Sequence, residues 1–142
     1  MTQIHQTKPQ IVLSDADYDR LANLAATAAE RLPDLAGELQ SELDRAQVVA
    51  IGAVPSHVVR MGSTVEFRAE GGMHRTVTLV FPGEADIASN RVSVLTPIGT
   101  ALIGLAKGQS IRWRTRDGRE QELTIIDVTP PAFGASPEQL LS

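Results

Sequence analysis

The sequence predicts an α+β protein: a short antiparallel helical hairpin (a coiled coil), followed by a small antiparallel β-sheet domain with one packed helix. Apolar residues recur at helical spacing across residues 14–48, and from Val58 onward the hydrophobic period changes to two. Between these patterns, residues 51–56 contain a glycine and a proline and fit neither period. We therefore expect an N-terminal tail at 1–13, the hairpin at 14–50, the sheet domain at 51–130 and a C-terminal tail at 131–142.

The composition is that of an ordinary globular chain and excludes several classes of protein. Of the 142 residues, 42% are apolar, 21% are charged and none is cysteine, which excludes disulfides, thiol nucleophiles and cysteine-ligated metals. No apolar run approaches the roughly 20 residues that span a bilayer, and the N-terminus lacks the apolar segment of a secretory signal. We expect a cytoplasmic protein without a membrane contact.

The hairpin is expected to begin at a capping box. The Ser14 hydroxyl can accept a backbone hydrogen bond while the Asp17 carboxylate reaches back along the chain. The first helix should run to about Arg31 and be stopped by Pro33. A second helix follows with Glu42 on its polar face, and arms of about 15 residues would be roughly 22 Å long. The apolar faces should be formed by Tyr18, Leu21, Ala25, Ala28 and Leu32 in the first helix, and by Leu35, Ala36, Leu39, Leu43 and Ala46 in the second.

The sheet domain is predicted from alternating apolar and polar residues separated by turn signals. A short helix should interrupt the series of strands, because Thr96 can cap it, Pro97 suits its first position, and Gly104 or Gly108 can end it. The expected strands are 64–68, 75–81, 91–95, 110–116 and 120–128, with turns at Gly71-Gly72 and Asp117-Gly118.

No set of residues has the spacing of a catalytic, cofactor or metal site. His5, His57 and His74 fall in a tail, a linker and a strand, without the further ligands that zinc requires. No glycine-rich loop matches a phosphate-binding fingerprint, and no serine lies in a nucleophile elbow. We therefore expect no catalytic residue, no cofactor and no bound metal.

One charged feature is basic. Residues 1–50 carry eight acidic and four basic side chains, whereas residues 51–142 carry nine of each, so any polyanion contact is expected in the second half. There Arg112, Arg114 and Arg116 alternate along one strand, opposite Trp113 and close to Arg119. This stripe is either a solvated outer face, which is the favoured interpretation, or a weak contact for nucleic acid or an acidic protein surface.

The other charged feature is acidic. Glu30 and Asp34 flank the expected tip of the hairpin. Carboxylates at the end of an arm can coordinate a divalent cation in a partner's site. More often such residues complement a helix end and keep a tip hydrated, which suits Asp34 at the start of the second helix.

Five segments, in this order, carry a family resemblance. They are Met61–Val65, Leu79–Ala85, Val92–Gly99, Ala101–Gly104 and Lys107–Ser110. The series resembles the C-terminal, FKBP-like domain of the GreA/GreB transcript-cleavage factors. The short hairpin, ending in Glu42–Ala46, and the entry to the sheet at Val58–Met61 are similar to the short-armed Rnk branch of that family, so that the resemblance spans roughly residues 10–131.

The resemblance implies a partner and a role. Domains of this type dock on bacterial RNA polymerase at the rim of the secondary channel, and the matching corner here is Leu95, Thr96 and Pro97, completed by Ile98 and Gly99. Leu95 departs from the family pattern, which commonly has a polar or acidic residue there. Gre factors also reach the catalytic centre with a long coiled coil, whose tip carboxylates hold magnesium, and this arm should be about half as long.

We therefore expect a non-catalytic, monomeric regulator that competes with Gre-type factors and influences nucleoside diphosphate kinase levels indirectly. The alternatives are a cleavage-stimulating factor despite the short arm, and a peptide-binding or prolyl-isomerase-like module. An isomerase needs an aromatic-lined pocket, and Phe67, Phe81 and Trp113 can each be placed in the core instead.

Overall fold

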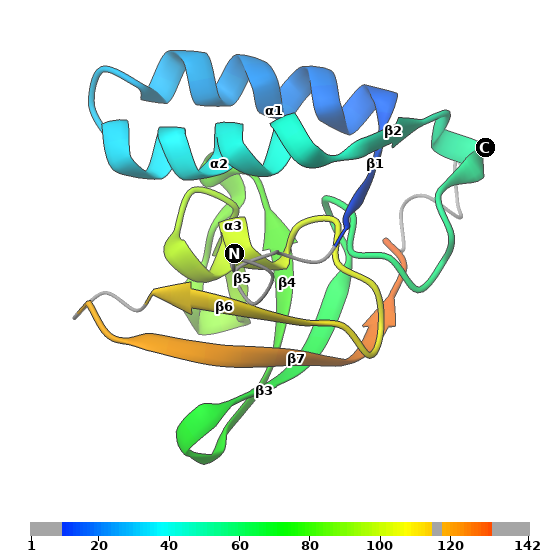
Figure 1. Cartoon of the computed structure of the whole chain (residues 1–142), viewed down its shortest axis with the longest axis vertical. Helices are drawn as coiled ribbons and strands as arrows, with labels where there is room; N and C mark the ends of the chain where they lie inside the picture. Colours follow the sequence, from blue (N-terminus) through cyan, green and yellow to red (C-terminus); the bar gives the residue numbers. More distant parts are fainter. Residues whose placement is uncertain (1–9, 115–117, 132–142) are drawn as a thin grey trace, which may run out of the picture.

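The computed structural model describes residues 10–114 and 118–131 and shows a helical hairpin lying over a five-stranded sheet (Figure 1). The hairpin consists of α1 (Asp15–Ala28) and α2 (Pro33–Arg45), and its two ends are joined by the paired strands β1 (Val12–Ser14) and β2 (Gln47–Val49). The sheet has the order β5-β4-β3-β7-β6, and α3 lies between it and α2. Its strands are β3 (Thr64–Ala69), β4 (Met73–Val80), β5 (Arg91–Ser93), β6 (Ser110–Arg114) and β7 (Glu120–Thr129); α3 spans Pro97–Leu102.

Only one of the two hydrogen bonds of the predicted capping box forms at the start of the hairpin. The Ser14 hydroxyl accepts the backbone N–H of Asp17 at 3.0 Å, as expected. The Asp17 carboxylate does not complete the box, because one of its oxygens instead accepts the backbone N–H of Met61 at 3.2 Å. This side chain is buried against the sheet domain, so it serves a tertiary contact rather than a local one.

The boundary between the two helices differs from the prediction. Helix α1 ends at Ala28, three residues early, where its carbonyl accepts the N–H groups of Arg31 and Leu32 and closes the last turn. Pro33 is not the residue that stops α1 but the first residue of α2, a position that needs no N–H donor. With 14 and 13 residues, the arms are each about 20 Å long.

The assignment of Glu42 to the polar face of the second helix is wrong. Its side chain is 3% exposed and pairs with Arg45 at 2.6 Å. Glu42 follows the buried Leu39 by three positions and precedes the buried Leu43, so helical geometry places it on the inward face. Of the other predicted apolar positions, Leu32 is 44% exposed because it lies in the connection between the helices.

The predicted strands are all present, but the sheet is mixed rather than antiparallel. Strand β5 pairs with β4 in parallel, with Thr78 opposite Arg91 and Val80 opposite Ser93. Between these strands the chain makes two short 3₁₀ turns, η4 (Pro82–Glu84) and η5 (Ile87–Ser89). The chain therefore returns to the C-terminal part of β4 and runs beside it in the same direction. The other three strand pairs of the sheet are antiparallel. The separate β1–β2 pair was not predicted and is parallel, like the β4–β5 pair.

One continuous apolar core joins the hairpin to the sheet. It contains Leu21 and Leu39 of the hairpin and Phe67 of the sheet, each fully buried. Strand β1 reaches the segment after α3, where the N–H of Val12 donates to the carbonyl of Gly104 at 3.2 Å. Gly104 ends α3 with a φ of +81°, and a Cβ there would lie 2.7 Å from the Cβ of Ile11. None of the helices in the described ranges is long and apolar enough to cross a membrane.

Candidate functional site

The corner at residues 95–99, which the sequence singled out, joins β5 to α3. Thr96 caps the helix as predicted: its hydroxyl accepts the N–H of Gly99 at 3.0 Å and donates to the carbonyl of Ser93 at 2.7 Å. Pro97 takes the first helical position. One threonine side chain therefore holds both the end of the strand and the start of the helix.

Two further side chains fix the same corner. The Ser93 hydroxyl accepts the N–H of Leu95 at 2.9 Å, and the buried Thr100 hydroxyl donates to the carbonyl of Val94 at 2.7 Å. Four side-chain hydrogen bonds therefore stabilise the path of the backbone through the corner.

Gly99 is required by the close approach of two backbone segments. A Cβ built at this position would lie 2.1 Å from the carbonyl oxygen of Ser93 and 2.8 Å from the Cα of Val94. Real Cβ atoms are not found at such distances, so no other residue fits without moving the strand or the helix. The glycine in the predicted corner is therefore a packing requirement and not itself a contact surface.

The corner residues are mostly half-buried. Leu95 and Ile98 are half-buried and pack against the core, and Gly99 is buried. Thr96 and Pro97 are half-buried to a similar degree. That this corner meets RNA polymerase stays a prediction.

The acidic residues predicted at the tip do lie there. Glu30 is in the connection between the helices, at the left of Figure 1, and Asp34 is in the first turn of α2; both are exposed. Among the described residues no group of three or more histidine or acidic side chains is arranged to hold a metal ion. The tip therefore presents two exposed carboxylates, one of which complements the N-terminus of α2.

The predicted arginine stripe is only partly described. Arg112 is exposed and Ile111, its neighbour in the strand, is buried, as the alternation requires. The Nε of Arg112 lies 3.8 Å from a carboxylate oxygen of Glu120, and Glu122 is its partner across the ladder. Arg119 is also exposed; Arg116 and the side chain of Arg114 lie outside the described residues. Acidic residues thus border the described part of the stripe.

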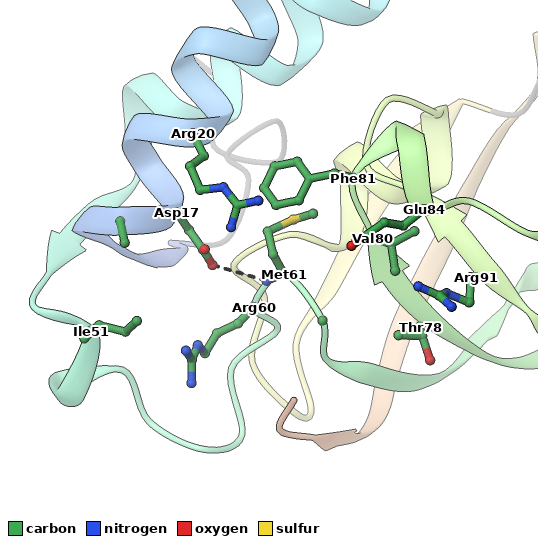
Figure 2. Close-up of a pocket in the computed structure, with 12 residues that line it drawn as sticks. Asp17, Arg20, Ile51, Arg60, Met61, Thr78, Val80, Phe81, Glu84 and Arg91 are labelled. Atoms are coloured by element: carbon green, nitrogen blue, oxygen red, sulfur yellow. Dashed lines mark hydrogen bonds between the residues drawn. The ribbon is translucent and has the colours of Figure 1, made fainter. Parts of the chain in front are cut away.

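The junction between hairpin and sheet is a feature that sequence reasoning missed. Figure 2 shows Asp17 beside Met61, with Arg20 extending over the ring of Phe81; the Arg20 guanidinium carbon is 4.0 Å from the ring centroid. Burial raises the pKa of the Asp17 carboxyl, while the hydrogen bond from Met61 and the charges of Arg60 and Arg20 oppose that rise. These residues are far apart in the sequence, so no local pattern could connect them.

Comparison with known proteins gives consistent matches over both halves. Residues 54–130 match the family model "Transcription elongation factor, GreA/GreB, C-term", and residues 9–49 match the model "Rnk N-terminus". The chain is 35% identical over 131 residues to the Regulator of nucleoside diphosphate kinase of Escherichia coli strain K12, covering 90% of this chain and 96% of the relative.

Further matches are elongation factors. The GreA of Rhodospirillum rubrum is 36% identical over 98 residues, covering 68% of this chain and 60% of that protein. A solved GreA/GreB elongation factor from Nitrosomonas europaea superimposes with a TM-score of 0.68 at 39% identity, covering 86% of this chain and 99% of that one.

Proposed function

Because the chain belongs to the GreA/GreB family and carries an Rnk-type N-terminus, we propose that it is a transcription regulator that binds bacterial RNA polymerase without stimulating transcript cleavage. The observation that carries the proposal is the combination of a GreA/GreB-type sheet domain with arms of only about 20 Å. The sheet domain supplies the family's means of docking, and the short hairpin removes its means of catalysis.

The corner at residues 95–99 is the proposed docking surface, at the rim of the secondary channel. The hydrogen bonds of Thr96 and Thr100 stabilise its backbone in the free protein. A preformed surface loses little conformational entropy on association, which favours binding. The half-buried Leu95 and Ile98 would contribute apolar contact at its edge, and Pro97 would lie at its centre.

The tip is proposed to be catalytically silent. Glu30 and Asp34 are exposed, but an arm of this length would hold them short of the polymerase catalytic centre when the sheet domain sits at the rim. Occupying the rim would still exclude longer-armed factors. An influence on nucleoside diphosphate kinase, suggested by the name of the E. coli relative, would then be an indirect effect on transcription.

A binding measurement with matched proline variants tests the docking surface. Immobilised bacterial core polymerase is titrated with the wild-type chain, with Pro97→Ala and with Pro55→Ala. Pro55 is exposed in the segment between hairpin and sheet, so it controls for the loss of a proline. We expect micromolar or tighter binding that weakens in Pro97→Ala and is unchanged in Pro55→Ala. Absence of binding, or equal binding by all three proteins, would refute the proposed surface.

A further inference from the structure

The loop between β4 and β5 holds a large apolar side chain in the solvent. Residues 82–90 are all exposed, and Ile87 in η5 is 87% exposed. In the described part of the chain the other exposed large apolar side chains, Leu32, Val48 and Ile51, are only 44%, 44% and 51% exposed. Single apolar residues are common on protein surfaces, so exposure alone does not indicate a contact. The way in which the loop is held, and its position next to the corner at residues 95–99, are what distinguish Ile87.

Hydrogen bonds within the loop fix the place of Ile87. Asp86 and Arg91 exchange two backbone hydrogen bonds of 2.9 Å each and so close the base of the loop. The Asp86 carboxylate accepts the N–H of Ala88 at 3.1 Å and the hydroxyl of Ser89 at 3.0 Å. The isoleucine therefore follows directly after a residue that ties down the turn on both sides of it.

The loop leads directly into β5, which is an edge strand of the sheet. The outward backbone groups of this strand are largely used by the chain itself. Both those of Arg91 bond to Asp86, and the carbonyl of Ser93 accepts the hydroxyl of Thr96. A partner therefore finds few free groups to which it could add a strand, and contact along this edge depends on side chains.

The corner by itself is too small for a stable protein interface. It has five residues, and all of them are buried or half-buried. A standard interface takes about 20–30 residues and about 800 Å² from each partner, which is a patch roughly 30 Å across. Strand β5, with the loop at one end and the corner at the other, has three residues and is about 10 Å long. One interface of ordinary size can therefore include both.

We infer that Ile87 is a second anchor of the docking surface, and that its side chain enters an apolar depression on RNA polymerase. This inference rests on the proposed binding to the polymerase. Burial of a side chain that is 87% exposed in the free protein favours association through the hydrophobic effect. Because the loop is already tied, little conformational entropy is lost. Contacts at both ends of β5 would also fix the orientation of this strand on the polymerase, which one contact cannot do.

The test is a titration of immobilised bacterial core polymerase with the wild-type chain, Ile87→Ala, Ile87→Leu and Val48→Ala. We expect Ile87→Ala to weaken binding by about tenfold or more, and Ile87→Leu to keep most of the affinity because it keeps an apolar side chain. Val48 is the matched control, an exposed apolar residue in β2, which lies apart from β5 and α3 (Figure 1). Its truncation should leave binding unchanged. Thermal unfolding verifies that each variant is folded.

The outcomes separate this inference from the proposed function. If the wild-type chain binds and Ile87→Ala binds equally well, the inference is overturned while polymerase binding stands. If Ile87→Ala weakens binding and Pro97→Ala does not, the loop is a contact and the proposed corner is not. If the wild-type chain does not bind, both proposals fail. An equal loss in Val48→Ala would also overturn the inference, because the effect would not be specific to the loop.

Sedimentation velocity of the chain alone tests the other possible occupant, a second copy of the chain. We expect Ile87→Ala to sediment as the wild-type chain does at every concentration. A wild-type dimer that Ile87→Ala abolishes would overturn the inference, because the isoleucine would then be covered by the chain itself.

Discussion

The carboxylate of Asp17 in α1 accepts the backbone N–H of Met61 at 3.2 Å, across 44 residues of sequence. This bond attaches the first turn of the hairpin to the segment that enters the sheet. Because Asp17 is buried, its loss would leave the N–H of Met61 without a partner in the interior. The pair therefore couples the position of the arm to the domain that carries the proposed docking corner.

Asp17→Asn should change how stability depends on pH. Burial raises the pKa of Asp17 above its ordinary value of 3.8, so between that value and the raised pKa the folded state binds more protons than the unfolded state. In wild type this group's contribution to the unfolding free energy is therefore largest below 3.8 and falls as the pH rises through the raised pKa. Asparagine keeps an oxygen for Met61 but does not ionise.

Urea unfolding of both proteins at pH 4 and pH 7 measures this effect. We expect the stability of Asp17→Asn relative to wild type to be more favourable at pH 7 than at pH 4. A relative stability that is independent of pH, or that changes in the opposite direction, would mean that the carboxyl is not destabilised by burial.

Gly99→Ala should be strongly destabilising, by about 3 kcal/mol or more, because the added methyl group overlaps the Ser93 carbonyl at 2.1 Å. Gly37→Ala is the matched control, since nothing lies within 4 Å of a Cβ at that exposed position of α2. Replacing a glycine inside a helix should stabilise the protein by about 0.5–1 kcal/mol. Chemical denaturation distinguishes the two, and equal effects would contradict the close approach at the corner.

Thr96→Ala should cost about 1–2 kcal/mol, because the hydroxyl caps α3 and also bonds to Ser93. Thr96→Ser keeps the oxygen and should recover most of the loss. Thermal unfolding followed by circular dichroism gives both values. If serine is as unstable as alanine, the lost stability comes from the threonine methyl group and not from the cap.

The tip carboxylates should be dispensable for the proposed binding. The double substitution Glu30→Gln and Asp34→Asn removes both charges without changing side-chain size, and both residues are exposed. We expect unchanged affinity for core polymerase and a loss of stability of about 0.3–1 kcal/mol, from the helix N-terminus at Asp34. A marked loss of polymerase affinity would show that the tip, and not only the corner, makes the contact.

The sequence predicts this fold well where the cause of structure is local. The cap at Thr96, the proline at the start of α3 and the glycine turn at residues 71–72 each depend on residues within four positions, and the structure confirms all three. The ends of α1 and α2 were less predictable, because Pro33 can either stop one helix or start the next.

Features that depend on contacts between distant parts of the sequence could not be predicted. The pattern of residues 91–95 identifies a strand, but only the path of residues 81–90 decides that it pairs in parallel with β4. Likewise, Asp17 has the spacing of a capping box and no local sign of its bond to Met61.

We propose that this chain occupies the polymerase rim without stimulating cleavage. The most direct test is transcript cleavage in a backtracked elongation complex with magnesium, measured with the chain alone and with a fixed amount of GreA titrated by the chain. We predict no cleavage by the chain alone and a progressive, saturable slowing of GreA-dependent cleavage. Shortened transcripts with the chain alone, or a GreA rate that does not respond to it, would contradict the account.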